Sequence, residues 1–305
     1  MTDPTGSPLR LMFVHAHPDD ETTTTGATIA RYAAEGVGVE LVMCTRGERG
    51  EMLAPDLAAQ LSDPDPDKAA RLLGAHRERE LAGACQALGI GPARFLGGAG
   101  RWWDSGVTGE AGNQDGRALA AGDLAEQAAE LAGLIHTIRP QVIVTYNERG
   151  GYGHPDHIRA HDITLAAVDA ARQDWPVARV YAAVVPRSAI LRGAELLAGS
   201  PMSGENPLAG MADPQILPFF VADEDVGAAV DARAYAAHKI DAMRAHRTQM
   251  PPDAWFFVLA EGAGAQFGME HYQLLRADGP VPDGVLDDLF AGLRAWPSRH
   301  YGVTD

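Results

Sequence analysis

Two short segments of the sequence carry residue types that bind and activate a metal ion. The first is residues 15–21 (HAHPDDE), and the second is residues 147–157 (NERGGYGHPDH). Each follows a short apolar run, residues 11–14 in the first case and residues 142–144 in the second. A catalytic zinc commonly takes three protein ligands and keeps one position for water. We therefore expect the two segments to meet in space and form one metal-hydrolase site.

The spacing within each segment suits metal binding. His17 and Asp20 are three residues apart, as are His154 and His157, and residues three apart share a face if the chain turns into a helix. The adjacent carboxylates of Asp19 and Asp20 point in different directions. One can bind a metal while the other acts as a general base on water whose pKa the metal lowers to about 7.

Spacing alone leaves rival ligands open. His15 shares a strand face with His17 and could replace it. His157 and His161 have the i,i+4 spacing that also suits a metal pair. Asp156 is either a ligand itself or a residue that orients a ligand histidine by contacting the ring nitrogen that does not bind the metal.

Strands and helices that alternate along the chain must position these segments. The pattern predicts strands over residues 11–14, 37–45, 93–96, 141–146 and 177–185, and helices over residues 25–34, 76–88, 124–138 and 155–171. This order predicts an α/β fold with a doubly wound, mostly parallel, Rossmann-like sheet. Ligands of such sheets bind beyond the carboxyl ends of the strands. Both histidine-rich segments are thus expected at the same edge.

The strand–helix alternation ends after Pro186, where Gly, Pro and Asp become frequent. We expect a metal-binding α/β domain over residues 1–186 and a smaller α+β lobe over residues 187–305 that helps to close the substrate site. Within the lobe the pattern predicts a long helix over residues 226–247, strands over 255–259 and 271–275, and a final helix over 285–293.

Composition limits the class of partner. The 25 basic and 41 acidic residues give a formal charge of −16, which argues against nucleic acid or an anionic membrane as partner. The sequence has no apolar run of about 18 residues, and its first residues do not resemble a signal peptide. We expect a cytoplasmic protein in which Cys44 and Cys85 are buried thiols. The sequence does not predict an oligomeric state.

The paired motifs AHPDDE (residues 16–21) and HPDH (residues 154–157) resemble those of the LmbE-like zinc deacetylases, which include the GlcNAc-PI de-N-acetylases. Residues 45–51 (TRGERGE), 77–81 (REREL), 97–106 (GGAGRWWDSG) and 147–154 (NERGGYGH) look most like the mycothiol-pathway branch of that family. The resemblance implies an N-acetyl amino-sugar–inositol substrate, GlcNAc-inositol, and release of acetate. The sister activity in this branch is cleavage of mycothiol S-conjugates by an amidase.

The resemblance also implies roles for individual residues. The positions that match zinc ligands are His17, Asp20 and His157. The positions that match catalytic groups are Asp19 as general base, His154 as general acid or oxyanion stabiliser, Asp156 as the residue that tunes it, and Tyr152 as a mobile tyrosine that polarises the substrate carbonyl. The positions that match sugar or inositol contacts are Arg77 and Asp104. The resemblance implies one Zn²⁺ per chain, although imidazole and carboxylate ligands also suit Fe²⁺ or cobalt.

Each of these assignments has a structural alternative. Arg77 could pair with Glu80 or Glu51, and Asp104 could cap a turn. Residues 246–249 (HRTQ) end the predicted long helix, and we interpret them as a structural or rim element. A zinc-dependent sugar-binding protein without turnover is a further alternative. It would need neither the base Asp19 nor an acid.

Overall fold

Strand β1, Arg10–His15, is an interior strand of a seven-stranded sheet in the computed structural model. The structure describes residues 8–198, 207–213, 216–217, 220–279 and 281–293. Successive side chains of a strand point to opposite faces. Leu11 and Phe13 accordingly pack in one core cluster, and Met12 and Val14 pack in another. This interior strand is therefore buried on both sides, as its continuous apolar run predicted.

The observed elements alternate between strand and helix up to the fifth strand. The strands are β1 Arg10–His15, β2 Gly38–Met43, β3 Arg94–Phe95, β4 Val142–Thr145, β5 Arg179–Val184, β6 Ala228–Asp231 and β7 Met269–Ala277. The helices are α1 Asp20–Thr23, α2 Gly26–Ala34, α3 Pro55–Leu61, α4 Pro66–Leu88, α5 Leu124–Ile138, α6 Gly150–Gly153, α7 Pro155–Ala171, α8 Arg187–Ala198, α9 Pro207–Met211, α10 Ala236–Ala245 and α11 Trp255–Ala263.

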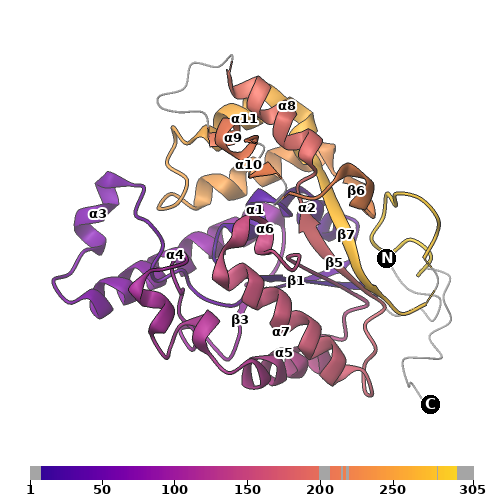
Figure 1. The fold of residues 1–305 in the computed structure, drawn as a ribbon, viewed down its shortest axis with the longest axis horizontal. Coiled ribbons are helices and arrows are strands. Elements are labelled where there is room, and N and C mark those ends of the chain that lie inside the picture. Colours follow the sequence, from indigo (N-terminus) through magenta and orange to yellow (C-terminus); the bar gives the residue numbers. More distant parts are fainter. Residues whose placement is uncertain (1–7, 199–206, 214–215, 218–219, 280, 294–305) are drawn as a thin grey trace.

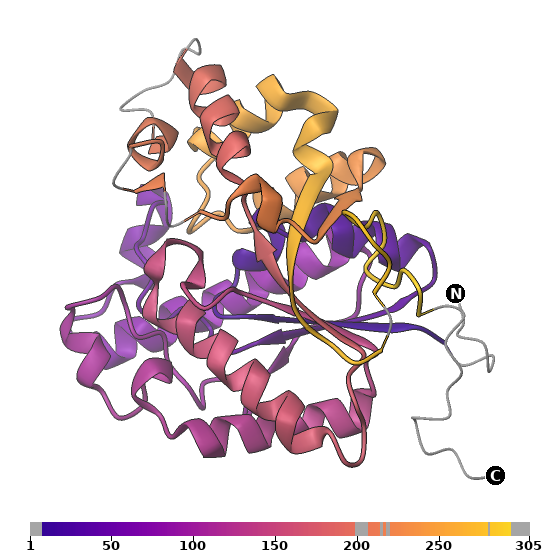
Figure 2. The ribbon, with the colours of Figure 1, turned by 45° about the vertical axis from the view of Figure 1, so that its right-hand side comes forward.

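The sheet has the strand order β3-β2-β1-β4-β5-β7-β6. The pairs β2–β3, β1–β2, β1–β4 and β4–β5 are parallel, and β7 pairs antiparallel with both β5 and β6. Helices α5 and α7 cover one face of the sheet, and α2, α4 and α10 cover the other (Figures 1 and 2). The predicted doubly wound, mostly parallel α/β fold is confirmed.

Strand order explains where the two histidine-rich segments meet. The chain continues from β1 to β2 on one side and returns to place β4 on the other side of β1. A crevice forms at such a switch point, outside the carboxyl ends of the two strands. The segment after β1 contains α1, and the segment after β4 contains α6. These two short turns lie together in the middle of the molecule (Figure 1).

Helix α4 is longer than the sequence pattern predicted. It begins at Pro66 and not at His76. The reason is local, because the Asp65 carboxylate accepts hydrogen bonds from the backbone N–H groups of Asp67 and Lys68, and proline is tolerated in the first turn of a helix.

The predictions for the C-terminal part of the chain were mostly wrong. Residues 226–247 are not one helix but contain β6, a short 3₁₀ turn and α10. Residues 255–259 belong to helix α11 and not to a strand, and residues 285–293 form turns and no helix. The strand predicted over residues 271–275 is present as β7. These elements depend on pairing between segments far apart in sequence, which local patterns do not report.

Strands β6 and β7 extend the same sheet that the N-terminal strands form. The division into residues 1–186 and residues 187–305 stays a prediction. Cys44 and Cys85 are buried and do not form a disulfide with each other. Among the residues that the structure describes, no helix has the length and apolar composition needed to cross a membrane.

Candidate metal centre

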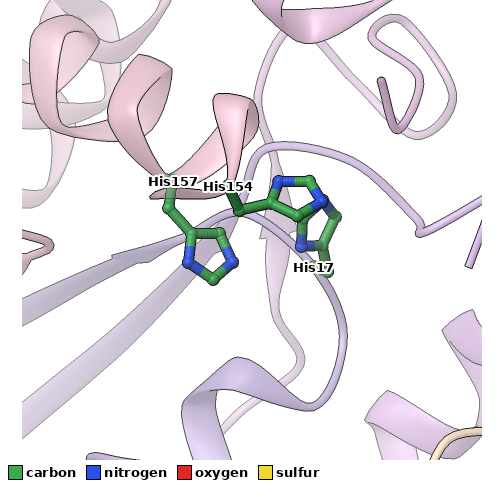
Figure 3. A group of neighbouring side chains, drawn as sticks. All are labelled: His17, His154 and His157. Carbon is green, nitrogen blue, oxygen red and sulfur yellow. The ribbon is translucent and has the colours of Figure 1, made fainter. Parts of the chain in front are cut away.

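Three imidazoles from the two segments converge at the switch point (Figure 3). His17 comes from the turn after β1, and His154 and His157 come from the start of α7. One ring nitrogen from each histidine lies within 4.8 Å of the others. His17 also takes part in a second group with Asp104 and Asp156. The segments predicted to meet do meet, at one buried cluster of imidazoles and carboxylates.

Asp20 lies between two of these imidazoles. Its Oδ2 atom is 3.4 Å from His17 Nδ1, and its Oδ1 atom is 3.4 Å from His157 Nε2. Two ligand atoms that each lie about 2.0–2.1 Å from a tetrahedral zinc are about 3.3–3.4 Å apart. Each pair thus has the spacing of two ligands of one metal, with a different oxygen atom of Asp20 in each pair.

One ring nitrogen of His157 makes no hydrogen bond within the described part of the chain, although Asp20 lies near it. The Nδ1 atom of His157 contacts the carbonyl oxygen of Gly150 at 3.1 Å. The buried Nε2 atom has no hydrogen bond. A metal-binding histidine shows the same arrangement, in which a carbonyl holds one nitrogen and the other is left as the ligand atom. This orphaned nitrogen supports a cation at the site.

His17 is fixed from behind by a carboxylate. Its Nε2 atom contacts Asp156 Oδ2 at 3.0 Å, and Asp156 in turn accepts hydrogen bonds from the backbone N–H and hydroxyl of Ser105. Burial alone would lower the pKa of His17, but Asp104, Asp156 and Asp20 raise it well above its usual value. The cluster thus attracts positive charge, which a metal ion can supply as well as a proton.

Asp19 has a strained backbone. Its φ of 123° and ψ of −29° lie in a region that only glycine adopts readily, which costs about 1–3 kcal/mol. The Asp19 side chain is 21 % exposed, and its Oδ1 atom lies 3.4 Å from Nη2 of Arg77. Loss of hydration in the site raises the pKa of Asp19 to about 7, although Arg77 opposes the rise. A carboxyl group with this pKa can both take and return a proton near neutral pH.

His154 caps helix α7 with its own ring. Its Nδ1 atom accepts a hydrogen bond from the Asp156 backbone N–H at 3.2 Å. Burial, together with the neighbouring imidazoles of His17 and His157, lowers the pKa of His154 to about 4. The ring is therefore neutral at pH 7, and its remaining proton is on Nε2. His154 is a hydrogen-bond donor in this state, and not the protonated imidazolium that the sequence reading assumed.

Tyr152 lies at the exposed rim of the site. Its side chain is 61 % exposed, and its ring lies 5.1 Å from that of His157 and 6.1 Å from that of His154. A pocket of about 120 Å³ opens beside it. One wall of the pocket carries Asp20 and His157, and the other is apolar. The residues of the apolar wall are Ala183, Val184, Val185, Phe220 and Val221.

The two predicted sugar contacts are both buried. Arg77 donates to the carbonyl oxygens of Gly47 and Pro18 at 2.9 and 2.6 Å, so its guanidinium joins two loops underneath Asp19. Asp104 accepts from the Gly106 backbone N–H, and its Oδ1 atom lies 3.6 Å from His17 Nε2. Arg77 therefore uses these carbonyls and not Glu80 or Glu51, whereas Asp104 does cap a turn through the Gly106 N–H, as its structural alternative predicted. Their role toward substrate stays a prediction.

The two rival histidines, His15 and His161, are engaged elsewhere, whereas Asp156 lies in the cluster behind His17. Both ring nitrogens of His15 contact hydroxyl groups, those of Tyr146 and Thr25, at 3.3 and 3.0 Å. His161 contacts the carbonyl oxygen of Tyr146 at 2.8 Å. The choice of His17 and His157, which spacing left open, is thus supported by what the other histidines contact.

Sequence reasoning missed Tyr146. Its hydroxyl donates to Asp20 Oδ2 at 2.7 Å and accepts from the Ala16 backbone N–H at 2.9 Å. Its ring stacks on that of His157 with a centroid distance of 4.2 Å. The available signal was its position, directly after a central strand and before the second motif.

A family model described as GlcNAc-PI de-N-acetylase matches residues 12–168. The chain is also 53 % identical to a 1D-myo-inositol 2-acetamido-2-deoxy-α-D-glucopyranoside deacetylase of Catenulispora acidiphila, with 96 % of this chain and 89 % of that protein covered. It is 49 % identical to a protein of the same description from Geodermatophilus obscurus, with 93 % and 98 % covered.

Solved structures share the fold at lower identity. The N,N′-diacetylchitobiose deacetylase of Pyrococcus horikoshii has a TM-score of 0.55 at 18 % identity, with 88 % of this chain and 82 % of that chain covered. GalB, a 4-carboxy-2-hydroxymuconate hydratase of Pseudomonas putida, has a TM-score of 0.58 at 17 % identity, with 90 % and 100 % covered. The fold alone therefore does not select the reaction.

Proposed function

Because the chain belongs to the GlcNAc-PI de-N-acetylase family, as its motifs predicted, we propose that it is a metal-dependent deacetylase of GlcNAc-inositol. It hydrolyses the N-acetyl group of 1D-myo-inositol 2-acetamido-2-deoxy-α-D-glucopyranoside to the free amine and acetate, a step of mycothiol biosynthesis. Relatives of 45–53 % identity that span most of the chain carry this description.

His17, Asp20 and His157 are the proposed ligands of one Zn²⁺ per chain. Two imidazoles and one carboxylate also suit Fe²⁺, so the test below includes both ions. When bound, the metal supplies Lewis-acid polarisation of the amide carbonyl and lowers the pKa of water. The His157 nitrogen that lacks a hydrogen bond and the 3.4 Å contacts of Asp20 support this ligand set.

Asp19 is the proposed general base. Its carboxylate is partly exposed beside the ligand cluster, and its pKa of about 7 leaves a large ionised fraction at neutral pH. The carboxylate takes a proton from the attacking water. Once protonated, the same carboxyl group can return that proton to the leaving amine.

His154 and Tyr152 are the proposed donors to the oxyanion that forms from the amide carbonyl. The Nε2–H of His154 needs no change of protonation, since its Nδ1 is occupied by a backbone N–H. Asp156 tunes the site by holding both that helix turn and His17. Tyr152 adds its phenol from the rim. Hydrogen-bond donors that point at the charge developing in the transition state make the largest single contribution to the rate enhancement of many enzymes.

The substrate extends over both sides of the cluster in this proposal. On one side, Arg77 and Asp104 are the proposed binding partners of the sugar and inositol hydroxyl groups. On the other side, Phe220 and Val221 bring the C-terminal residues to the pocket wall. This supports the proposal that residues 187–305 form a lobe that helps to close the site.

The observation that carries the proposal is the contact of one carboxylate, Asp20, with two imidazoles from different segments, in a chain of this family. The test is release of acetate from GlcNAc-inositol by protein loaded with Zn²⁺ or Fe²⁺, and by the same protein after chelation, with metal analysis of each sample. We expect turnover only with about one metal per chain. Turnover that is unaffected by complete chelation would contradict the proposal.

A parallel assay with a mycothiol S-conjugate separates the two activities of this branch. We expect a higher kcat/KM for GlcNAc-inositol. A clear preference for the conjugate would replace the deacetylase by the amidase, and zinc-dependent sugar binding without any turnover would leave only a binding role.

A further inference from the structure

His246 lies at the end of α10, far from the metal cluster in sequence, and its side chain is fully buried. Its Nε2 atom contacts Glu21 Oε1 at 2.6 Å. Glu21 is also fully buried and directly follows the proposed ligand Asp20 in the chain. A residue of the HRTQ segment, which the sequence analysis assigned to structure or rim, thus reaches the first histidine motif.

Glu21 uses its second oxygen on the residue proposed as the base. Its Oε2 atom accepts the backbone N–H of Asp19 at 2.9 Å. This is the residue whose φ of 123° is unfavourable for any side chain. A strained conformation persists only where surrounding contacts hold it. The Glu21 carboxylate supplies such a contact directly on the strained peptide.

The segment that carries His246 is itself anchored. The backbone N–H and the hydroxyl of Thr248 both donate to the buried carboxylate of Glu80 on α4, at 2.9 and 2.6 Å. The side-chain amide of Gln249 donates to the carbonyl oxygen of Glu51 at 2.9 Å. His246 is therefore held in place independently of Glu21, so it can fix the position of the Glu21 carboxylate.

We propose that Glu21 and His246 are positioning residues that hold Asp19 in its strained conformation and so aim its carboxylate at the attacking water. The inference rests on the proposed function, because it takes Asp19 as the general base. Neither residue contacts the reacting atoms. Their contribution is exerted through the backbone of Asp19.

Matched substitutions separate hydrogen bonding from packing. His246→Leu and Glu21→Leu remove the contacts, whereas His246→Gln and Glu21→Gln keep amide groups that can make them. We expect the Leu variants to lose kcat by roughly 10- to 100-fold, the effect of a displacement of about 1 Å. KM and metal content should be unchanged, and the Gln variants should keep most of the wild-type kcat. Folded, metal-loaded Leu variants with wild-type kcat would overturn the inference.

A control for general destabilisation is available on the same helix. Lys239→Met removes a buried ion pair with Glu270, whose atoms lie 2.8 Å apart, without touching Glu21 or Asp19. We expect this variant to melt at a lower temperature and to keep kcat. Where His246→Leu does not fold, His246→Asn, whose shorter amide does not reach Glu21, takes its place.

A double-mutant cycle tests whether the effect passes through Asp19. In an Asp19→Asn background, the further change His246→Leu should lower the residual kcat by less than twofold, because there is no base left to position. A merely structural role would give the same 10- to 100-fold loss in both backgrounds, and that result would refute the inference.

Crystal structures of the Leu variants give a readout that needs no turnover. We expect residue 19 to leave the positive-φ region in Glu21→Leu and its carboxylate to move away from Arg77. An unchanged backbone at residue 19 would overturn the inference even if activity fell. If the wild-type protein does not hydrolyse GlcNAc-inositol at all, the proposed function fails, and these structures alone decide whether Glu21 and His246 position Asp19.

Discussion

The two segments that form the metal centre are built in opposite ways. The β1 segment, residues 15–25, is tightly bonded: His15, Glu21 and Thr25 are fully buried, and nearly every polar side chain in it bonds within the segment or to a neighbour. The β4 segment, residues 147–157, contains Gly150, Gly151 and Gly153, all with positive φ, and exposes most of Tyr152.

This difference indicates a division of labour. The β1 segment holds two proposed ligands, His17 and Asp20, and the proposed base in fixed positions, with backbone strain at Asp19. The β4 segment has the backbone freedom of three glycines, which allows Tyr152 to adjust to a substrate. The predictions below test whether damage to the fixed segment costs more than damage to the adjustable one.

The largest effect is expected for Asp20→Ala. Asp20 lies 3.4 Å from a ring nitrogen of both His17 and His157, so its loss should abolish stoichiometric metal binding. Loss of an outer partner of a ligand typically costs 10- to 100-fold in metal affinity, and loss of the ligand itself should cost more than about 100-fold. The measurement is metal content by mass spectrometry together with kcat/KM.

Asp162→Ala is the matched control for this variant, since Asp162 is an exposed residue on α7. It should retain both metal and turnover. Full metal content in Asp20→Ala would remove Asp20 from the ligand set.

The second effect concerns the base in the same segment. Asp19→Asn should retain the metal but lower kcat by roughly 10²- to 10⁴-fold. Because the ionised carboxylate is the active form, wild-type kcat/KM should rise with pH through the pKa of Asp19. That pKa is about 7 without a cation, and a bound cation favours the ionised form, so the acidic limb should lie below pH 7 in the loaded enzyme.

The pH–rate profile of Asp19→Asn should lack this acidic limb. An unchanged limb in the variant would assign the titration to another group. An unchanged kcat would remove Asp19 from the mechanism.

Sequence patterns predicted the scaffold of the site because its signals are local. Helices α5 and α7 were predicted at their observed bounds from an apolar stripe ended before Pro140 and from Pro155 in a first turn. The C-terminal elements were not, because alanine-rich residues 226–247 fit a helix locally, whereas pairing with β7 makes residues 228–231 a strand. Pairing partners about 40 residues away leave no local signal.

The same distinction holds within the site. The two motifs predicted that His17, Asp20, His154 and His157 would lie close together, and they do. The prediction was possible because each motif directly follows an interior strand of the sheet. The strain at Asp19 could not be predicted, since nothing in an HPDD sequence indicates a positive φ. Residues 246–249 were interpreted as a structural or rim element because they end a predicted helix, and the contact of His246 with Glu21, which spans 225 residues, has no local signal.

A third, smaller effect is expected when a glycine of the β4 segment is replaced by alanine. A Cβ atom on Gly150 would lie 2.8 Å from both the Cβ of His157 and the backbone nitrogen of Ile158, whereas a Cβ on Gly153 would meet nothing within 4 Å. Both residues have positive φ, so each Ala variant should lose about 1 kcal/mol of stability. Only Gly150→Ala should also displace His157 and lower kcat/KM, by up to roughly 100-fold.

Measurement of metal affinity, kcat/KM and the free energy of unfolding for this pair separates backbone strain from displacement of a ligand. Equal kcat/KM values for the two variants would show that the backbone of the β4 segment can shift to accommodate the added Cβ without displacing His157. The segment would then be adjustable even beside this proposed ligand.

The smallest effect is expected for Tyr152→Phe. The phenol is at the exposed rim, so it competes with water for the substrate oxygen, unlike the buried donor His154. One neutral hydrogen bond is worth about 1 kcal/mol net, so kcat should fall about tenfold at most, with metal content unchanged. Tyr152→Ala should lower kcat no further if only the hydroxyl contributes, and should raise KM if the ring also covers the substrate. If Tyr152→Phe lowered kcat as much as Asp19→Asn, the rim tyrosine would have to be held as firmly as the β1 segment in the substrate complex. The contrast between the two segments would then hold only before substrate binds.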